Sequence, residues 1–185
     1  LEAIKVYVKK LVELDIRIAA SRPREFRITH LEQELSSSLT LSDGMAIFVK
    51  GKVDRIDRQN GLLRIIDYKS PVRSSDRFEF TSFADLFHDP GYDKLLQLFI
   101  YSWLAWKNGL GSAPEIRPCI IPFKVFSEDP RIITSGRQPF TFSEPLLSDF
   151  ERQLTDFISS VFSRDVPFRQ TEDRDQCGFC AYNVI

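Results

Sequence analysis

The chain has 185 residues, of which 43% are hydrophobic and 12% aromatic, enough to bury one sizeable core. Its 25 basic and 26 acidic residues give a net charge of −1, so composition neither requires nor excludes a polyanionic partner. No apolar run approaches the roughly 18 residues of a membrane span, and an odd number of cysteines, three, argues against a secreted disulfide framework. We therefore expect a cytoplasmic protein without a membrane partner. Residues 1–185 are expected to form a single domain and, because the chain opens on Leu1, to be a fragment of a larger protein.

The hydrophobic pattern predicts an α/β fold in which strands come first, followed by a helix, a strand and a helix. The expected strands are rich in β-branched residues, whereas the expected helices repeat their apolar residues with helical spacing. The expected elements are a helix over 1–20, a strand over 26–41, a turn at 42–44, a hairpin over 45–69, a helix over 93–107, a strand over 116–126 and a helix over 145–163.

Three of these elements carry more detailed expectations. The strand over 116–126 contains two prolines, which argue for an edge or irregular strand. In the last helix, Ser143 can act as the N-cap and Pro145 suits the first turn. The apolar stripe of the first helix consists of Ile4, Val8, Leu11 and Val12, and that of the last helix consists of Leu147, Phe150, Leu154, Phe157, Ile158 and Val161.

The hairpin centres on Asn60-Gly61. This dipeptide between apolar residues favours a two-residue turn, because both turn positions need a positive φ. In the register that the turn sets, the numbers of opposed residues sum to 121, as 60 and 61 do, so that Asp54 faces Asp67. Like charges directly opposite each other destabilise a sheet, so this pair of aspartates calls for a reason.

The same side of the strand pair carries Lys69, because residues two apart point to one face of a sheet. Two carboxylates on Cβ atoms about 4.5–5.5 Å apart either share a proton or bind a cation. Mg²⁺ suits two carboxylates completed by waters and phosphate oxygens, and a neighbouring lysine can position the attacking water. Asp54, Asp67 and Lys69 are therefore the parts of metal-assisted phosphodiester hydrolysis. The alternative is an ordinary solvated hairpin face with cross-strand ion pairs.

The motifs around these residues are Gly51, Asp54, Arg55 and Asp57 as G-x-x-D-R-x-D, Asp67 and Lys69 in IIDYKS, and Gln97 and Tyr101 as Q-x-x-x-Y. Together they resemble the PD-(D/E)xK nuclease superfamily, and within it the RecB/AddB-type branch of helicase–nuclease repair complexes and CRISPR adaptation. The resemblance covers roughly residues 30–185. It implies a restriction-endonuclease-like core, in which a mixed β-sheet is flanked by helices.

The resemblance also implies a role for each motif residue. The divalent metal, Mg²⁺ or Mn²⁺, would be bound by Asp54, Asp67 and the backbone carbonyl of Tyr68. Lys69 would be the catalytic lysine. Gln97 and Tyr101, four residues apart on one face of a helix, would line the site and contact DNA or brace the ligands.

Two further metal ligands of the family are less clear in this sequence. A glutamate often lies on the strand that leads into the hairpin, and Glu32 is the better match, with Glu34 second; either can also be a surface acid. RecB-type relatives carry a metal-binding histidine on an earlier helix. His30 and His88 are the only histidines here, and neither occupies that place, so the sequence departs from the pattern at the second metal.

Cys177 and Cys180 form a C-x-x-C near the end of the chain. One such pair also fits ordinary thiols, half of a zinc site or a redox pair. Relatives with an iron–sulfur cluster have C-x-x-C-x-x-x-x-x-C at this end and a fourth cysteine far upstream. The resemblance therefore implies a [4Fe-4S] site that only a longer protein would complete. Cys119 lies in an apolar strand and is expected to be a core residue.

A local basic region favours contact with DNA. Between Lys50 and Arg77 there are eight basic and four acidic residues, a local charge of +4. Such a region suits the phosphate backbone, although a solvated hairpin would have the same composition. Nothing resembles a base-reading helix, so the binding is expected to be independent of sequence. The expected DNA-binding residues are Lys52, Arg55, Arg58 and Arg73.

These expectations together predict metal-dependent hydrolysis of DNA phosphodiester bonds. The predicted context is the exonuclease domain of a RecB/AddB-type recombination-repair helicase–nuclease, with DNA and a helicase subunit or domain as partners. Two alternatives stay open: a catalytically inactive DNA-binding or scaffold module of the same fold, and a stand-alone CRISPR-adaptation nuclease. The presence of Asp54, Asp67 and Lys69 together favours catalysis over the scaffold.

Overall fold

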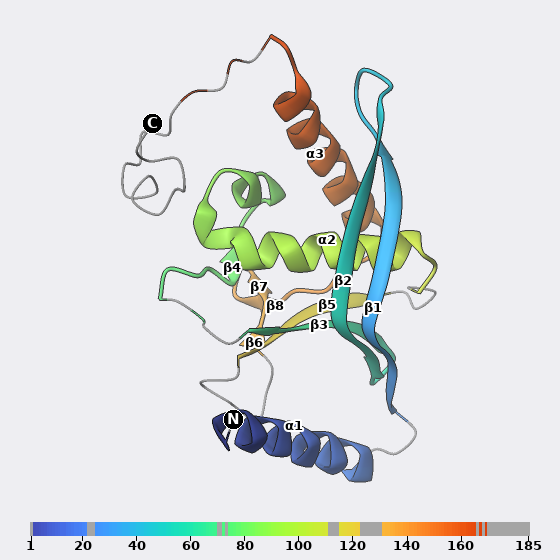
Figure 1. Cartoon of the computed structure of the whole chain (residues 1–185), viewed down its shortest axis with the longest axis vertical. Helices are drawn as coiled ribbons and strands as arrows, with labels where there is room; N and C mark the ends of the chain where they lie inside the picture. The colour runs from blue at the N-terminus through green and yellow to red at the C-terminus, as the bar shows by residue number, and fades with distance from the viewer. Residues whose placement is uncertain are drawn as a thin grey trace.

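The computed structural model describes residues 2–21, 25–69, 72, 74–110, 115–122, 131–165, 167 and 169 of the chain (Figure 1). Its centre is a five-stranded sheet in the order β1-β2-β3-β5-β6, in which β3 and β5 are parallel and the other neighbours antiparallel. The strands are β1 (Phe26–Thr40), β2 (Ala46–Gln59), β3 (Leu62–Lys69), β5 (Ile116–Pro122) and β6 (Arg131–Ile132). A smaller sheet consists of β4 (Glu79–Phe80), β7 (Thr134–Ser135) and β8 (Gln138–Pro139).

Helices cover both faces of the five-stranded sheet (Figure 1). The helix α2 crosses one face over β1, β2, β3 and β5 and packs against α3, whereas α1 lies on the opposite face. These helices are α1 (Glu2–Ser21), α2 (Asp93–Lys107) and α3 (Glu144–Phe162), and two 3₁₀ helices, η1 (Phe83–Phe87) and η2 (Pro90–Tyr92), precede α2. None of the described helices is long and apolar enough to cross a membrane. The predicted α/β class, a mixed sheet flanked by helices, is confirmed.

The β2–β3 hairpin has the predicted turn and register. Asn60 and Gly61 both adopt a positive φ, +53° and +80°, the conformation that a two-residue hairpin turn requires. Asp57 pairs with Arg64 and Ile56 with Ile65, as the turn predicts. The side of each strand that holds the predicted site residues is thereby fixed.

A cluster of phenylalanine rings fills the core under α2. Their ring centroids lie between 4.7 and 6.2 Å apart, mostly in edge-to-face or stacked pairs, geometries that add to the free energy of simple burial. The rings come from β4, η1, α2, the segment between β8 and α3, and α3, and belong to Phe80, Phe83, Phe99, Phe140, Phe142 and Phe150. This shared core holds the rotation of α2 about its axis and thereby determines which of its side chains face the sheet.

The buried face of α1 is not the predicted stripe. Leu14 is buried and Leu11 packs on the rear face of the sheet, but Ile4, Val8 and Val12 are 66%, 49% and 49% exposed. Apolar residues surround most of α1, so periodicity alone does not select a face. An ion pair between Asp15 of α1 and Arg55 of β2, with Nη1–Oδ2 2.7 Å, selects the face that is buried.

The strand over 116–126, expected to be an edge or irregular strand, does not lie at the edge of the sheet. β5 ends at Pro122 and lies between β3 and β6. β6 pairs only with Cys119 and Ile120, so Pro118 and Pro122 lie outside the pairing on that side and both prolines are tolerated. Residues 123–126 of the predicted strand lie outside the described residues.

The last helix begins where the sequence predicts. Ser143 is the N-cap residue of α3 and Pro145 lies in the first turn, although the Ser143 side chain makes no capping hydrogen bond. Leu147, Phe150 and Leu154 are buried as expected. Val161, the last residue of the predicted stripe, is 43% exposed.

Cys119 is a core residue, as predicted, and is expected to resist alkylation in the folded protein. It is 2% exposed, and burial raises the pKa of its thiol to about 11, so little reactive thiolate exists at pH 8. Mass spectrometry of the peptide containing Cys119 after iodoacetamide treatment should show modification only when the chain is unfolded first. Rapid modification of the native chain would contradict this assignment.

Candidate active site

The first part of the site lies where β2 parts from β3. The antiparallel ladder between these strands ends one position before Asp54 and Asp67. Asp54 reaches across at this point, because its Oδ2 accepts a hydrogen bond of 2.7 Å from the backbone N–H of Tyr68. Tyr68 stands between Asp67 and Lys69, so the Asp54 carboxylate meets β3 in the middle of the D-x-K segment.

Asp67 is a buried carboxylate with incomplete hydrogen bonding. It is 4% exposed; burial raises its pKa, Lys69 opposes this rise, and the charge of Asp54 adds to it. Its Oδ2 lies 2.9 Å from Lys69 Nζ but accepts no hydrogen bond of favourable geometry from the described residues. Among the described residues, Asp67 thus has an oxygen without a hydrogen bond and lies close enough to Asp54 for the two charges to repel. This is the arrangement expected of two carboxylates that bind a cation together.

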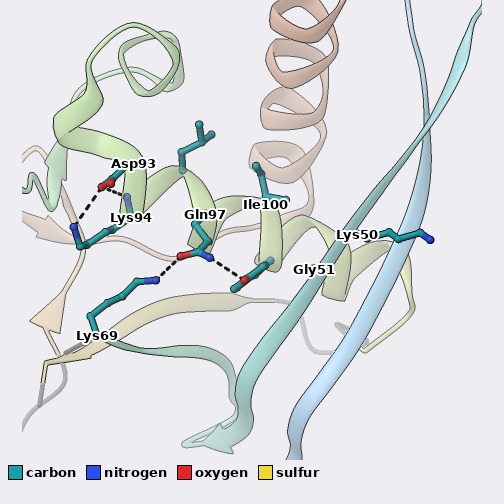
Figure 2. Close-up of a pocket in the computed structure, with 9 residues that line it drawn as sticks. Lys50, Gly51, Lys69, Asp93, Lys94, Gln97 and Ile100 are labelled. Atoms are coloured by element: carbon teal, nitrogen blue, oxygen red, sulfur yellow. Dashed lines mark hydrogen bonds and ion pairs between the residues drawn. The ribbon is translucent and has the colours of Figure 1, made fainter. Parts of the chain in front are cut away.

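Lys69, Gln97 and Tyr101 form a chain of hydrogen bonds that joins β3 to α2 (Figure 2). Lys69 Nζ donates to Gln97 Oε1 at 2.5 Å, and Gln97 Nε2 donates to the Tyr101 hydroxyl at 2.9 Å. Burial raises the pKa of Tyr101, so the hydroxyl stays protonated at neutral pH. The structure places Gln97 and Tyr101 together on one face of α2 beside the cavity, as their four-residue spacing predicts, and their roles there stay a prediction.

A cavity of about 640 Å³ opens beside this chain, within the range of small-molecule sites. Its wall carries three cations, Lys50, Lys69 and Lys94, together with Gln97 and the apolar side chains of Leu96 and Ile100. Figure 2 shows Lys69 directed toward Gln97, and Lys50 on β2 directed away from both. Asp93 lines the same cavity, so the lining holds three lysines and one acid, a positive balance that suits an anionic ligand such as a phosphate.

Gly51 allows Tyr101 to lie against β2. A Cβ atom at residue 51 would come within 2.6 Å of Tyr101 Cε1 and 3.2 Å of Leu104 Cδ1, and the first distance is far inside van der Waals contact. The glycine of the G-x-x-D-R-x-D motif therefore makes room for the ring whose hydroxyl accepts the Gln97 hydrogen bond.

Gly51→Ala is expected to lower DNA cleavage by about tenfold and the free energy of unfolding by about 1–3 kcal/mol, because the ring must move and release Gln97. The measurements are cleavage rates and thermal unfolding for Gly51→Ala, Tyr101→Ala and the double variant. In the Tyr101→Ala chain, which lacks the ring, Gly51→Ala should reduce cleavage and stability much less than it does in the wild type. The effects of the two changes should therefore not be additive. Strictly additive effects would show that the ring does not mediate the effect.

A divalent cation fits the carboxylate pair. In a strand, the N–H and C=O of one residue point to the same neighbour, so the Tyr68 carbonyl borders the gap that Asp54 enters. Among the described residues no cluster of three or more His, Cys, Asp or Glu side chains could hold a metal. Mg²⁺ often takes one or two carboxylates and leaves other positions to water and substrate phosphate. The donor set therefore fits an open Mg²⁺ or Mn²⁺ site.

The prediction that Arg55 binds DNA is wrong. Arg55 is 2% exposed and points to the α1 face, where it donates to Asp15 and, through Nε at 2.8 Å, to Asp57. Arg64 Nε donates to the other Asp57 oxygen at 2.6 Å. Neighbouring strand residues alternate between faces, so Asp54 lies on the α2 side of the sheet, near the cavity but not in its lining, while Arg55 and Asp57 form a buried ion network on the α1 side.

The other predicted residues lie farther from the cavity or outside the description. Lys52 Nζ pairs with Glu32 Oε2 at 2.6 Å, both exposed, and Lys52 borders a second cavity of about 570 Å³ that shares Lys50 and Gly51 with the first. In the β1–β2 register, Leu31 and Gln33, the neighbours of Glu32, pair with Arg55 and Val53, the neighbours of Asp54. Arg58 donates to the Leu110 carbonyl and does not line the cavity. Arg73, Cys177 and Cys180 lie outside the described residues.

Sequence reasoning missed Lys94 and Asp76. Lys94 lines the cavity, and its Nζ lies 2.7 Å from Asp76 Oδ1. Lys94 could have been found, because it precedes Gln97 by three residues and Tyr101 by seven and so shares their helix face. Asp76 lies in a polar loop without periodicity, and no pattern in the sequence indicates its contact.

Comparison with known proteins covers nearly the whole chain. Residues 2–185 match the family model described as PD-(D/E)XK nuclease superfamily. Among solved structures, the chain is similar to one titled "Crystal structure of SSO0001", with a TM-score of 0.43 and 17% identity, covering 97% of this chain and 66% of that chain. The chain thus spans about two thirds of the length of that structure. No curated protein sequence matches it.

Proposed function

Since the chain belongs to the PD-(D/E)XK nuclease superfamily, we propose that it hydrolyses DNA phosphodiester bonds with Mg²⁺ or Mn²⁺ held by Asp54 and Asp67. The observation that carries the proposal is the hydrogen bond that brings the Asp54 carboxylate to the backbone of Tyr68, between Asp67 and Lys69, whose side chains pair with each other. A bound Mg²⁺ or Mn²⁺ would polarise a phosphate oxygen and lower the pKa of a bound water.

The residues of the chain have distinct tasks in this proposal. Asp67 and Asp54 supply negative charge for the cation, and the Tyr68 carbonyl is the third protein ligand. Lys69 has three donors. One donates to Gln97 while the ammonium group forms an ion pair with Asp67, so a donor is left for the attacking water or the scissile phosphate. Gln97 and Tyr101 hold this ammonium in place from α2.

Removal of divalent metal is expected to abolish cleavage. The test incubates the chain with linear single-stranded and double-stranded DNA in Mg²⁺, in Mn²⁺ or in EDTA, and follows the products on denaturing gels. Cleavage in Mg²⁺ or Mn²⁺ that EDTA stops and added metal restores would support the proposal. Equal cleavage by wild type and Lys69→Ala, or no cleavage with either metal, would favour the scaffold module instead.

We further infer that the chain acts as an exonuclease domain of a RecB/AddB-type recombination-repair helicase–nuclease. The order of G-x-x-D-R-x-D, D-x-K and Q-x-x-x-Y supports this branch over more distant members of the superfamily. A helicase subunit or domain would then deliver the DNA strand. Release of short products from linear DNA, with covalently closed circles left intact, distinguishes this role from an endonuclease.

A further inference from the structure

Lys94 lines the cavity but has no role in the proposed catalytic mechanism. It lies in the first turn of α2, one turn before Gln97 (Figure 2). It lines the same cavity as Lys69 and Gln97, so its side chain borders the space that the proposed catalytic lysine borders.

The ammonium group of Lys94 is held in one place. Its Nζ lies 2.7 Å from Asp76 Oδ1 and 3.5 Å from Asp93 Oδ1. The side chains of Lys94 and Asp76 are only 11% and 4% exposed. A lysine ammonium has three donors, and these two acids accept at most two of them. Within the part of the chain that the structure describes, one donor is therefore available to a ligand in the cavity.

Helix stability does not explain this lysine. The first turn of a helix favours acids, because the helix dipole places positive partial charge there. Asp93 meets that preference, whereas Lys94 opposes it. Burying an ion pair also costs desolvation that its own attraction often fails to offset. A cation placed at such a cost on the wall of a cationic cavity is better explained by an anion that enters the cavity.

We propose that Lys94 binds the DNA phosphate next to the one that is cleaved, and that Asp76 is a positioning residue for its ammonium group. The proposal rests on the proposed function, in which Lys69 and the carboxylate pair take the scissile phosphate. Lys94 precedes Gln97 by three residues, a rise of about 4.5 Å along α2, so it is placed to meet a neighbouring phosphate. Such a contact positions the strand without reading its sequence.

The test measures binding separately from cleavage. In an Asp67→Asn chain, fluorescence anisotropy of a short labelled single strand gives the binding constant over a range of salt concentrations. Adding Lys94→Gln should reduce the slope of log K against log salt by about 0.7, the value for one lost phosphate contact. Lys9→Gln removes the same charge from α1, where Lys9 is 78% exposed and pairs with Glu13, and should leave the slope unchanged.

Kinetics in the chain with Asp67 intact provide the second readout. Lys94→Gln should raise KM about tenfold and leave kcat within about twofold. The reason is that the contact with the neighbouring phosphate is equally strong in the bound substrate and in the transition state. Lys94→Arg should restore most of the loss, and Asp76→Asn should weaken binding but keep the slope, because the charge remains. An unchanged slope and KM in Lys94→Gln, with only thermal stability reduced, would overturn the proposal and leave Lys94 as a structural partner of Asp76. Binding with a reduced slope but without cleavage in any metal would overturn the nuclease function and retain the phosphate contact.

Discussion

Asp67→Asn is expected to reduce metal-dependent DNA cleavage by about 10³-fold while leaving thermal stability unchanged or higher. The loss in rate corresponds to several kcal/mol of transition-state stabilisation, because asparagine supplies no negative charge to the cation site. The gain in stability follows from burial, which raises the pKa of Asp67 above that of the unfolded chain. Above that raised pKa the folded state holds an unfavourable charge, which asparagine removes.

Asp149→Asn is the matched control. Asp149 lies on α3, where its partly exposed side chain pairs with Arg152 at 2.5 Å. Loss of such an exposed pair changes stability by less than about 1 kcal/mol, and cleavage should stay at the wild-type rate. The measurements are initial cleavage rates in Mg²⁺ and Mn²⁺ and thermal unfolding at pH 7. An Asp67→Asn chain that cuts at the wild-type rate would remove Asp67 from the active site.

Asp57→Ala is expected to lower the free energy of unfolding by about 3–5 kcal/mol, the usual consequence of removing one partner from a buried ion network. Asp57 is 0% exposed and accepts hydrogen bonds from both Arg55 and Arg64. Arg55 keeps Asp15 as a partner, but Arg64, 7% exposed, loses the carboxylate that both of its hydrogen bonds reach. Urea titration followed by circular dichroism measures the change directly.

The double variant Asp57→Ala/Arg64→Ala separates the uncompensated charge from the lost packing. If the buried guanidinium causes the instability, removing it should recover part of the loss despite the larger cavity. A double variant that is less stable by the sum of both single effects would show that packing, not charge, dominates. Asp15→Ala should cost less, because its side chain is 20% exposed and Arg55 keeps Asp57.

The hairpin and the face of the candidate site were predictable because each depends on local geometry. Asn60-Gly61 requires positive φ at both positions, and this sets the register without any distant contact. Strand alternation then places Asp67 and Lys69 on one face. The four-residue spacing of Gln97 and Tyr101 likewise places them together on α2. The roles of these residues in catalysis remain proposals, which the variants above test.

The errors arose where a choice depends on partners distant in the sequence. The first helix has apolar residues on two sides, and only the pairing of Asp15 with Arg55 selects the buried one. The same pairing removes Arg55 from any DNA surface. Strand alternation could have excluded Arg55 from the DNA surface, since Arg55 follows Asp54 directly and must point to the other face of the sheet. A local count of basic residues does not distinguish a buried guanidinium from an exposed one.

The local sequence pattern could not predict that β5, the strand with two prolines, lies inside the sheet, nor that the small sheet exists. β5 lies inside the sheet because it runs parallel to β3 and β6 covers its other side over two residues. β4, β7 and β8 have two residues each, too short for any periodicity to predict. Their place depends on the phenylalanine rings that pack between them and α2.

The alternation along β2 also limits how this segment can evolve. Asp54 lies on the α2 side of the sheet and Arg55 on the α1 side, so adding or deleting a single residue between them and the Asn60-Gly61 turn would exchange their sides and damage both at once. Substitutions can be tolerated here one at a time, but changes of length cannot. Natural variation in length should therefore accumulate at the far β1–β2 tip, near Asp43 and Gly44, where an added Cβ on Gly44 meets no atom within 4 Å.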